Sequence, residues 1–217
     1  MPGAGQRIEK MQGHWVLVRA GKRVLRPGGL GLTRRMIDAL SISSDDGVVE
    51  FAPGMGVTAR MVLRKNPLHY WGVERDPEAA VRLEAILPKG ATQVIPAQAE
   101  CSGLPSASAN VVYGEAMLSM QTREQKQRIV SEAVRLLAAG GRYGIHELCF
   151  RPGGIPERKR REIEAEMSKE IHVGVQPLTC REWKQMLEQH GLKVTWTGEA
   201  DLNLLEPRRI LQDEGIV

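Results

Sequence analysis

Short apolar runs alternate with amphipathic stretches along most of the chain. The clearest amphipathic stretch spans 122–139, where Val130, Ala133, Val134 and Leu137 recur with the spacing of one helical face. Strands that alternate with helices are typical of βαβ units and a parallel sheet. The pattern therefore predicts an α/β fold. The expected strands are 47–51, 69–74, 92–96, 110–114, 142–148 and 193–197, and the expected helices are 33–40, 58–64, 77–87, 122–139, 157–171 and 180–190.

Local signals set the ends of several helices. Pro77 suits the first turn of a helix, where its missing N–H is not needed. Thr179 and Glu182 have the spacing of a capping box, which predicts a helix that begins there. The Gly140-Gly141 pair is expected to end the long helix before it.

The composition suits one domain with an ordinary core. The chain has 217 residues, of which 42% are hydrophobic and 26% charged. We therefore expect a single domain over 1–217. No run approaches the roughly 18 apolar residues that a membrane span needs. Three separated cysteines without C-x-x-C spacing predict neither a disulfide framework nor a zinc site, and make the cytoplasm the expected location.

Positive charge is concentrated near the N-terminus. Residues 1–40 contain eight lysines and arginines against Glu9 and Asp38. Such a patch suits an anionic partner or a solvated helical face. We expect residues 1–30 to form a basic cap and the charged segment 155–172 to form a helical lid over a pocket. The basic residues are Arg7, Lys10, Arg19, Lys22, Arg23, Arg26, Arg34 and Arg35.

The segment VVEFAPGMG reads as a strand, a tight turn and the start of a helix. Gly54 and Gly56 let the backbone bend and approach a ligand closely, because no Cβ intervenes. The helix that follows offers unpaired N–H groups to a carboxylate or phosphate. Glu74 comes twenty positions after Gly54, at the end of the second expected strand. A carboxylate there can accept both hydroxyls of a ribose.

These residues fit two cofactors. Gly54, Gly56 and Ala59 with Glu74 satisfy the dinucleotide fingerprint, so an NAD-dependent oxidoreductase is one hypothesis. Glu50 favours the other, because an acid just ahead of the glycines suits the cationic amino-acid end of S-adenosylmethionine better than a pyrophosphate. The glycine turn also comes later in the chain than in a dinucleotide fold, which usually opens with it.

The chain resembles class I S-adenosylmethionine-dependent methyltransferases, near the group that includes ubiquinone and menaquinone C-methyltransferases. The likeness covers roughly residues 30–200, and its most specific part is motif I. It implies a doubly wound, Rossmann-like and mostly parallel sheet with helices on both faces, helical lid elements and an antiparallel C-terminal strand, for which 193–197 is the candidate. The matching segments are VVEFAPGMG for motif I, YWGVERDP for the second strand, VIPAQAECSGLP for the adenine loop, ANVVYGEAML for the fourth strand and LLAAGGRYGIHEL for the fifth.

The resemblance implies cofactor-binding roles position by position. Gln98 stands where the family usually has aspartate, so an amide would contact the adenine. Glu115, at the end of the fourth strand, would face the sulfonium. The expected cofactor-binding residues are Glu50, Gly54 and Gly56 at the methionine end, Phe51 and Ala52 in the same motif, Glu74 and Arg75 at the ribose and adenine, Gln98, Ala99 and Glu100 over the adenine, and Glu115.

The methyl carbon of a sulfonium is already electrophilic, so the main task of such a protein is to align the reactants. A general base is needed only for an acceptor that arrives protonated. His146 and Glu147 end the fifth strand, at the edge where ligands bind in open α/β sheets, and are the candidate catalytic residues. A structural histidine is the alternative for His146. No metal is expected, because no second spaced ligand accompanies this pair.

The methyl acceptor is expected to be a small molecule. After the fourth strand there is no Asn/Asp-Pro-Pro-Tyr run of the kind found in amino-group nucleic-acid methyltransferases, and no aromatic platform for single strands appears. Nucleic acid is therefore not the expected partner. An RNA methyltransferase that uses the basic N-terminal residues, and a non-catalytic cofactor-binding module, are the alternatives. Met117 and Met120 are candidates to line an apolar pocket.

Overall fold

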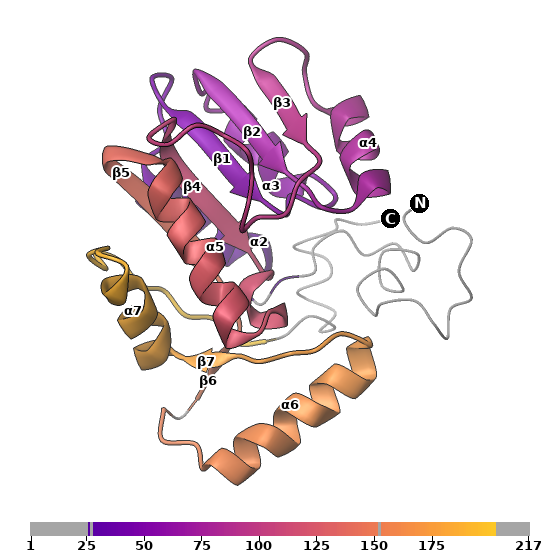
Figure 1. Cartoon of the computed structure of the whole chain (residues 1–217), viewed down its shortest axis with the longest axis vertical. Coiled ribbons are helices and arrows are strands. Elements are labelled where there is room, and N and C mark those ends of the chain that lie inside the picture. Colours follow the sequence, from indigo (N-terminus) through magenta and orange to yellow (C-terminus); the bar gives the residue numbers. More distant parts are fainter. Residues whose placement is uncertain (1–25, 27, 152, 203–217) are drawn as a thin grey trace.

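A parallel sheet of five strands forms the centre of the molecule (Figure 1). The structure, a computed structural model, describes residue 26 and residues 28–151 and 153–202. The strand order is β3-β2-β1-β4-β5, and every neighbouring pair is parallel. This confirms the α/β fold and the mostly parallel sheet. The strands are β1 (Gly47–Phe51), β2 (His69–Val73), β3 (Thr92–Ile95), β4 (Ala109–Glu115) and β5 (Leu137–His146).

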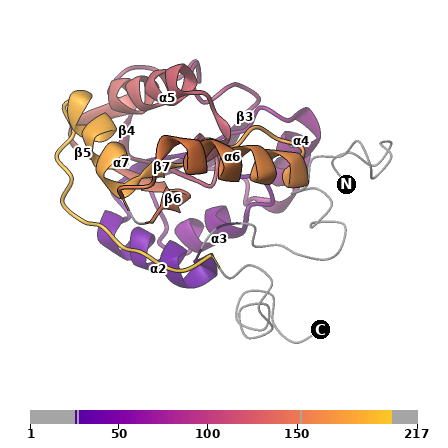
Figure 2. The same ribbon diagram turned by 90° about the horizontal axis from the view of Figure 1, so that it is seen from below.

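Helices cover both faces of the sheet. Alternate residues of a strand face opposite sides. Val48 and Val111 therefore pack with one helical layer, and Val49 and Val112 pack with the other. Figure 2 shows α2 and α3 on one side of the strands and α5 and α7 on the other. The first layer contains α2 (Gly29–Leu40), α3 (Val57–Leu63) and α4 (Pro77–Ile86), and the second contains α5 (Arg123–Leu136) and α7 (Cys180–Gln189).

Capping boxes set the starts of α5 and α7. The Thr122 hydroxyl accepts a hydrogen bond from the backbone N–H of Gln125, whose side chain in turn accepts from the N–H of Thr122. Thr179 and Glu182 make the same reciprocal pair, which confirms the capping box expected there. The first turn of α5 follows a short 3₁₀ helix, η2 (Leu118–Met120), so it lies near the carboxyl end of β4.

The end of α5 differs from expectation. The helix stops at Leu136 and β5 begins at Leu137, so Gly140 and Gly141 lie inside the strand. Gly140 has a φ of +75°, and the β4–β5 register shifts between Ala109 and Val111. A glycine with positive φ at an irregularity of the ladder is typical of a β-bulge. The glycine pair therefore shapes the strand rather than ending the helix.

The chain after α7 is not a strand. Residues 193–197 have no strand assignment, so the described part of the chain contains no antiparallel C-terminal strand. This segment contacts α2 instead. The Arg35 guanidinium lies 5.6 Å from the centre of the Trp196 ring, and its Nη1 donates to the Glu199 carbonyl. These contacts hold the segment along the helix.

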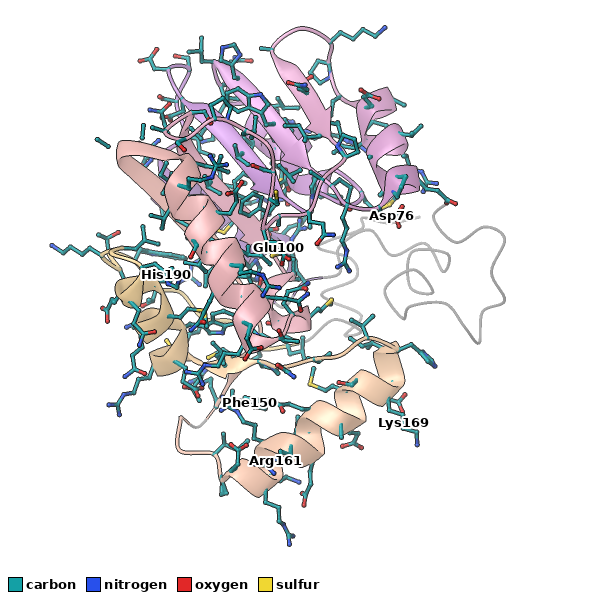
Figure 3. All side chains as sticks on the ribbon, in the orientation of Figure 1. Asp76, Glu100, Phe150, Arg161, Lys169 and His190 are labelled. Carbon is teal, nitrogen blue, oxygen red and sulfur yellow. The ribbon has the colours of Figure 1, made fainter. Side chains whose placement is uncertain are left out.

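The charged segment 155–172 contains a helix, α6 (Glu157–Ile171), with the bounds that the sequence predicts. None of its residues is buried, and Figure 3 shows charged side chains along it, including Arg161 and Lys169. The helix connects a small two-stranded parallel sheet, β6 (Cys149–Phe150) and β7 (Leu178–Thr179). Among the described residues no helix has the length and apolar character needed to cross a membrane.

Candidate functional site

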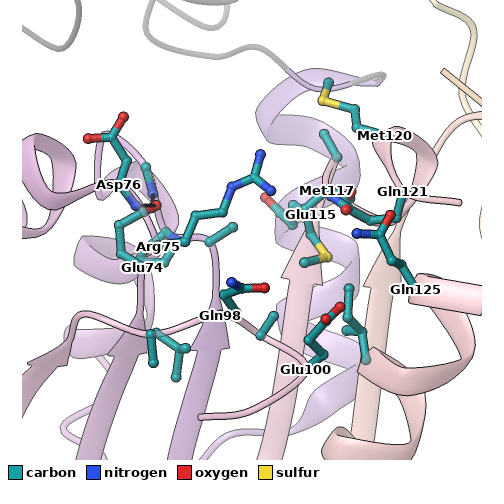
Figure 4. A pocket seen from close by; sticks show the side chains of 18 of the residues that line it. Glu74, Arg75, Asp76, Gln98, Glu100, Glu115, Met117, Met120, Gln121 and Gln125 are labelled. Carbon is teal, nitrogen blue, oxygen red and sulfur yellow. Dashed lines mark hydrogen bonds between the residues drawn. The ribbon is translucent and has the colours of Figure 1, made fainter. Parts of the chain in front are cut away.

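A cavity of about 240 Å³ opens at the carboxyl ends of the parallel strands (Figure 4). Its walls come mainly from the carboxyl ends of four strands and the loops that follow them: 52–54 after β1, 74–76 after β2, 97–100 after β3 and 115–117 at the end of β4. The strand order reverses between β1 and β4, since the chain runs outward to β3 and then returns to the other side of β1. Open α/β sheets bind ligands at such a switch point.

The two glycines of the first loop have different tasks. Gly54 has a φ of +53°, and a Cβ placed there would meet only the Ala52 carbonyl oxygen, at 3.9 Å. The position therefore keeps the cavity wall open. Gly56 has a φ of +68°, and its Cβ would come within 2.7 Å of Leu83 and 2.9 Å of Ile86. Gly56 thus allows close packing against α4 and does not line the cavity.

Two alanines at the cavity have strained backbone. Ala52 and Ala116 follow β1 and β4, with φ values of +53° and +51°. A non-glycine residue in this region costs about 1–2 kcal/mol. The Ala52 N–H donates to the Val73 carbonyl and the Ala116 N–H to the His146 carbonyl, each at 2.8 Å, which holds both residues in place. Strain of this kind clusters at functional sites.

Glu74 is buried at the cavity wall and held by the backbone. Its Oε2 accepts from the Gly54 N–H and its Oε1 from the Asp76 N–H, both at 3.0 Å. Burial raises the pKa of Glu74, although the two backbone donors oppose the shift. Each carboxylate oxygen keeps a second lone pair that can accept from a ligand hydroxyl. The Gly54 N–H therefore orients the Glu74 carboxylate, because its hydrogen bond is made to that side chain.

Glu115 is the most extensively contacted acid of the cavity. Its Oε2 lies 2.8 Å from Arg26 Nε and accepts from the hydroxyls of Thr58 and Thr33 at 3.0 and 3.2 Å. Its Oε1 lies 3.5 Å from His146 Nδ1. Burial works against ionisation, but Arg26 and the hydrogen-bond donors outweigh it and hold the pKa of Glu115 below its usual value. Glu115 is therefore a carboxylate at neutral pH.

Arg26 lines the cavity but was not among the expected site residues. Its backbone carbonyl accepts from the Gly29 N–H at 3.1 Å, in the turn that begins α2. The sequence does show this turn, as Arg26-Pro27-Gly28-Gly29 directly before a helix. Nothing in the local pattern shows that the turn lies over the ends of β1 and β4, because that placement depends on tertiary packing.

Glu50 faces away from the cavity. Its Oε2 accepts hydrogen bonds from the hydroxyls of Tyr70 and Tyr113 within the layer of α2, α3 and α4. Burial raises the pKa of Glu50 to about 7, although the two tyrosine hydroxyls oppose the shift. Phe51, the next residue, faces the α5 layer. The structure therefore does not bring Glu50 or Phe51 to the wall of this cavity, and their cofactor-binding roles stay predictions.

The remaining predicted cofactor positions converge on the cavity. Gln98 and Cys101 form an isolated bridge, and the Cys101 N–H donates to the Gln98 carbonyl at 3.0 Å, which shapes the loop after β3. Met117 and Met120 also line the cavity, as expected. The predicted cofactor residues that line it are Ala52, Gly54, Glu74, Arg75, Gln98, Ala99, Glu100 and Glu115.

The two candidate catalytic residues do not line this cavity. Glu147 is partly buried and accepts from the N–H groups of Met117, Leu118 and Ser119 and from the Ser119 hydroxyl. It therefore organises the turn after β4. His146 lies against Glu115, and both candidates border a second cavity of about 540 Å³ along β5. Their catalytic roles stay predictions.

Comparisons with known sequences give a family relative. No protein-family model matches the chain. An uncharacterised protein of Haemophilus influenzae is 33% identical over 208 residues, which are 94% of this chain and 81% of that protein. The ribosomal RNA small subunit methyltransferase A of Maridesulfovibrio salexigens is 30% identical over 63 residues, which are 29% of this chain and 24% of that protein.

Solved structures share the fold. The complex between the Haloferax volcanii Trm112 methyltransferase activator and a methyltransferase matches with a TM-score of 0.66 and 14% identity, over 83% of this chain and 82% of that chain. An S-adenosylmethionine-dependent methyltransferase of Mesorhizobium loti matches at 0.64 and 15%, over 75% and 81%. A geranyl diphosphate C-methyltransferase of Streptomyces coelicolor, solved with S-adenosylhomocysteine, matches at 0.60 and 17%, over 74% and 57%. The fold is therefore that of class I S-adenosylmethionine-dependent methyltransferases.

Proposed function

We propose that this chain, which belongs to the same protein family as the uncharacterised protein of Haemophilus influenzae, transfers the methyl group of S-adenosylmethionine to a small-molecule acceptor. The observation that carries the proposal is the pairing of Gly54 and Glu74. Gly54 leaves the wall open where a side chain would project, and its N–H fixes Glu74 beside that opening. A fixed acid at the end of β2 suits the two hydroxyls of a ribose.

The charges around the cavity also suit this cofactor. Four acids line it, against two arginines, and a sulfonium is a cation. Figure 4 shows Glu74 on one side of the cavity, Glu115 and Met117 on the other, the Arg75 side chain reaching in between, and Glu100 below them. The lining acids are Glu74, Asp76, Glu100 and Glu115, and the lining arginines are Arg26 and Arg75.

Three groups of residues would contact the adenine, the ribose and the sulfonium side of the cofactor. We propose that Gln98, Ala99 and Glu100 contact the adenine and that Glu74 accepts the ribose hydroxyls. Glu115, a carboxylate next to Ala116 at the end of β4, then lies toward the sulfonium side. S-adenosylmethionine supplies an electrophilic methyl group, so the protein needs mainly to align the acceptor and exclude water.

The acceptor side is proposed to be apolar. Met117 and Met120 line the cavity beyond β4. A lid that includes α6 would then exclude water, although α6 lines neither cavity in this structure. The proposed basic cap over residues 1–30 lies almost entirely outside the described residues. The His146 side chain lies 3.5 Å from Glu115, so we propose that it influences transfer by orienting that carboxylate.

Titration calorimetry with S-adenosylhomocysteine and with NAD tests the proposal. We expect S-adenosylhomocysteine to bind and Glu74→Gln to weaken its binding at least about tenfold, which is about 1.4 kcal/mol. The glutamine side chain has only one oxygen, so its NH₂ end cannot accept one of the two hydrogen bonds that the Gly54 and Asp76 N–H groups donate to Glu74. Glu78→Gln is the matched control, because Glu78 is exposed on the first turn of α4. Binding of NAD alone would contradict the proposal, and salt-sensitive retention on RNA would favour an RNA acceptor.

A further inference from the structure

One end of the cavity contains a buried pair of opposite charges, Arg26 and Glu115. We propose that this pair binds the amino-acid end of the cofactor, with Arg26 on its carboxylate and Glu115 on its ammonium group. The inference rests on the proposed function and names the residues that recognise one part of the ligand. It replaces Glu50, which the sequence places at the methionine end but the structure turns toward Tyr70 and Tyr113.

Arg26 offers an unused donor in a fixed position. Its side chain is 12% exposed, and its Nε lies 2.8 Å from Glu115 Oε2. Its Nη2 is buried and has no hydrogen-bond partner among the described residues. A buried donor left unpaired costs roughly 1–3 kcal/mol, and more when it is charged. A carboxylate is the ligand group that best fits the planar fork of a guanidinium.

Glu115 offers an acceptor beside it. The Oε2 atom already receives Arg26 and the hydroxyls of Thr58 and Thr33. Its Oε1 is buried and has no hydrogen-bond partner among the described residues, and His146 Nδ1 lies 3.5 Å from it, beyond the usual range of a hydrogen bond. Oε1 therefore retains capacity for a ligand ammonium. The lowered pKa of Glu115 keeps the carboxylate charged for this contact.

The pairing of charges favours a zwitterion over a simple anion. Glu115 would repel an isolated carboxylate that approached Arg26, and Arg26 would repel an isolated cation that approached Glu115. An α-amino acid carries both charges on one carbon and matches both partners at once. The other arginine of the cavity, Arg75, belongs to the loop after β2, next to Glu74, whereas Arg26 makes the ion pair with Glu115. Arg26 is thus the lining arginine that pairs with Glu115.

The turn before α2 is built to place Arg26. Gly28 and Gly29 have φ values of +70° and +56°, which favour glycine. A Cβ on Gly28 would come within 2.8 Å of Ala200 Cβ and 2.9 Å of Leu32 Cβ. The tight turn brings Arg26 to the ends of β1 and β4, where it meets Glu115.

Three ligands separate the parts of the cofactor. S-adenosylhomocysteine has the whole amino-acid end, its decarboxylated analogue lacks only the carboxylate, and 5′-methylthioadenosine lacks both charged groups. We expect the unaltered protein to bind the decarboxylated analogue at least about tenfold more weakly than S-adenosylhomocysteine. Equal affinity of the unaltered protein for S-adenosylhomocysteine and its decarboxylated analogue would by itself overturn the proposal. Failure to bind any of the three would instead overturn the proposed function.

Variants then assign the carboxylate contact to Arg26. Arg26→Gln is expected to weaken S-adenosylhomocysteine about tenfold or more and to leave the other two ligands within about twofold. Arg34→Gln, exposed on α2, is the control. If Arg26→Gln does not fold, Arg26→Lys serves, with a smaller loss expected because the fork is absent. Equal weakening of all three ligands would show a structural role, and unchanged affinity for S-adenosylhomocysteine would show that Arg26 does not contact the carboxylate; either result overturns the proposal.

Discussion

Glu50 is a carboxylic acid enclosed within the helical layer of α2, α3 and α4. It is 4% exposed, and its nearest partners are the hydroxyls of Tyr70 and Tyr113. The charges that act on it are Glu115, which raises its pKa, and Arg26, which lowers it. Burial dominates, so the pKa of Glu50 rises to about 7 and the folded protein favours its neutral form below that pH.

This shift predicts a pH-dependent stability. Between about pH 4.5 and about 7 the folded state binds more protons at Glu50 than the unfolded state, so the free energy of unfolding falls as the pH rises through this window. Glu50→Gln cannot ionise, and its amide oxygen can accept from both tyrosines. We expect the variant to lose less stability in urea between about pH 5 and about pH 8. Parallel pH curves for the two proteins would contradict this, and Glu84→Gln, exposed on α4, is the control.

Side-chain direction explains which site residues the sequence could predict. Gly54 and Glu74 belong to a turn and a strand end whose geometry is local, and both line the cavity. Glu50 belongs to a strand, where each step of one residue reverses the face, so its acidity alone could not place it. Arg26 reaches the cavity through the packing of the turn before α2, which no periodic pattern records.

At the scale of elements, α6 is joined to the rest of the molecule by few contacts. Arg160 is the main one. Its guanidinium pairs with Glu182 on α7 and lies 5.2 Å from the centre of the Phe150 ring. Glu182 also accepts from the N–H and hydroxyl of Thr179 at the start of α7. One carboxylate thus caps α7 and ties α6 to it.

Two substitutions at Glu182 separate these tasks. Glu182→Gln keeps an oxygen for the capping box and loses the charge, so a cost below about 1 kcal/mol is expected for this partly exposed pair. Glu182→Ala loses both tasks and should cost roughly 1–2 kcal/mol. Hydrogen exchange of α6 and the first turn of α7 measures the effect, with Glu188→Gln on the exposed face of α7 as control. Equal effects of the two substitutions would show that the ion pair with Arg160 alone matters, because only Glu182→Ala also removes the cap.

Element positions were predictable where one signal dominates. The first four strands are short apolar runs between turn residues. Both ends of each strand lie within one residue of the predicted ends. The range 193–197 also alternates, with Val194 and Trp196 on one side, but Trp196 stacks on Arg35 and the segment follows α2. Its partner is a helix distant in sequence, so the pattern within the segment could not show it.

At the scale of the whole molecule, the sheet separates a ligand edge from a structural edge. The loops after β1, β2, β3 and β4 form the cavity of about 240 Å³, and the loops that enter these strands lie at the other edge. The larger cavity of about 540 Å³ lies along β5, between α2, α7 and the segment 191–199. Volume alone would favour the second cavity, whereas the glycine turn and the converging polar groups favour the first.

Hydrogen exchange with and without S-adenosylhomocysteine decides between the two cavities. A ligand at 100 times its Kd stabilises the bound state by about 2.7 kcal/mol, so amides that exchange by local opening at its site slow strongly. We expect slowing at 52–56, 74–76, 97–100 and 115–118. The entry loops at 41–46 and 87–91 should change little, as should α6, which lines neither cavity. Protection centred on β5 and 191–199 would place the ligand in the second cavity, because only there would binding order those segments and leave the glycine turn free to open.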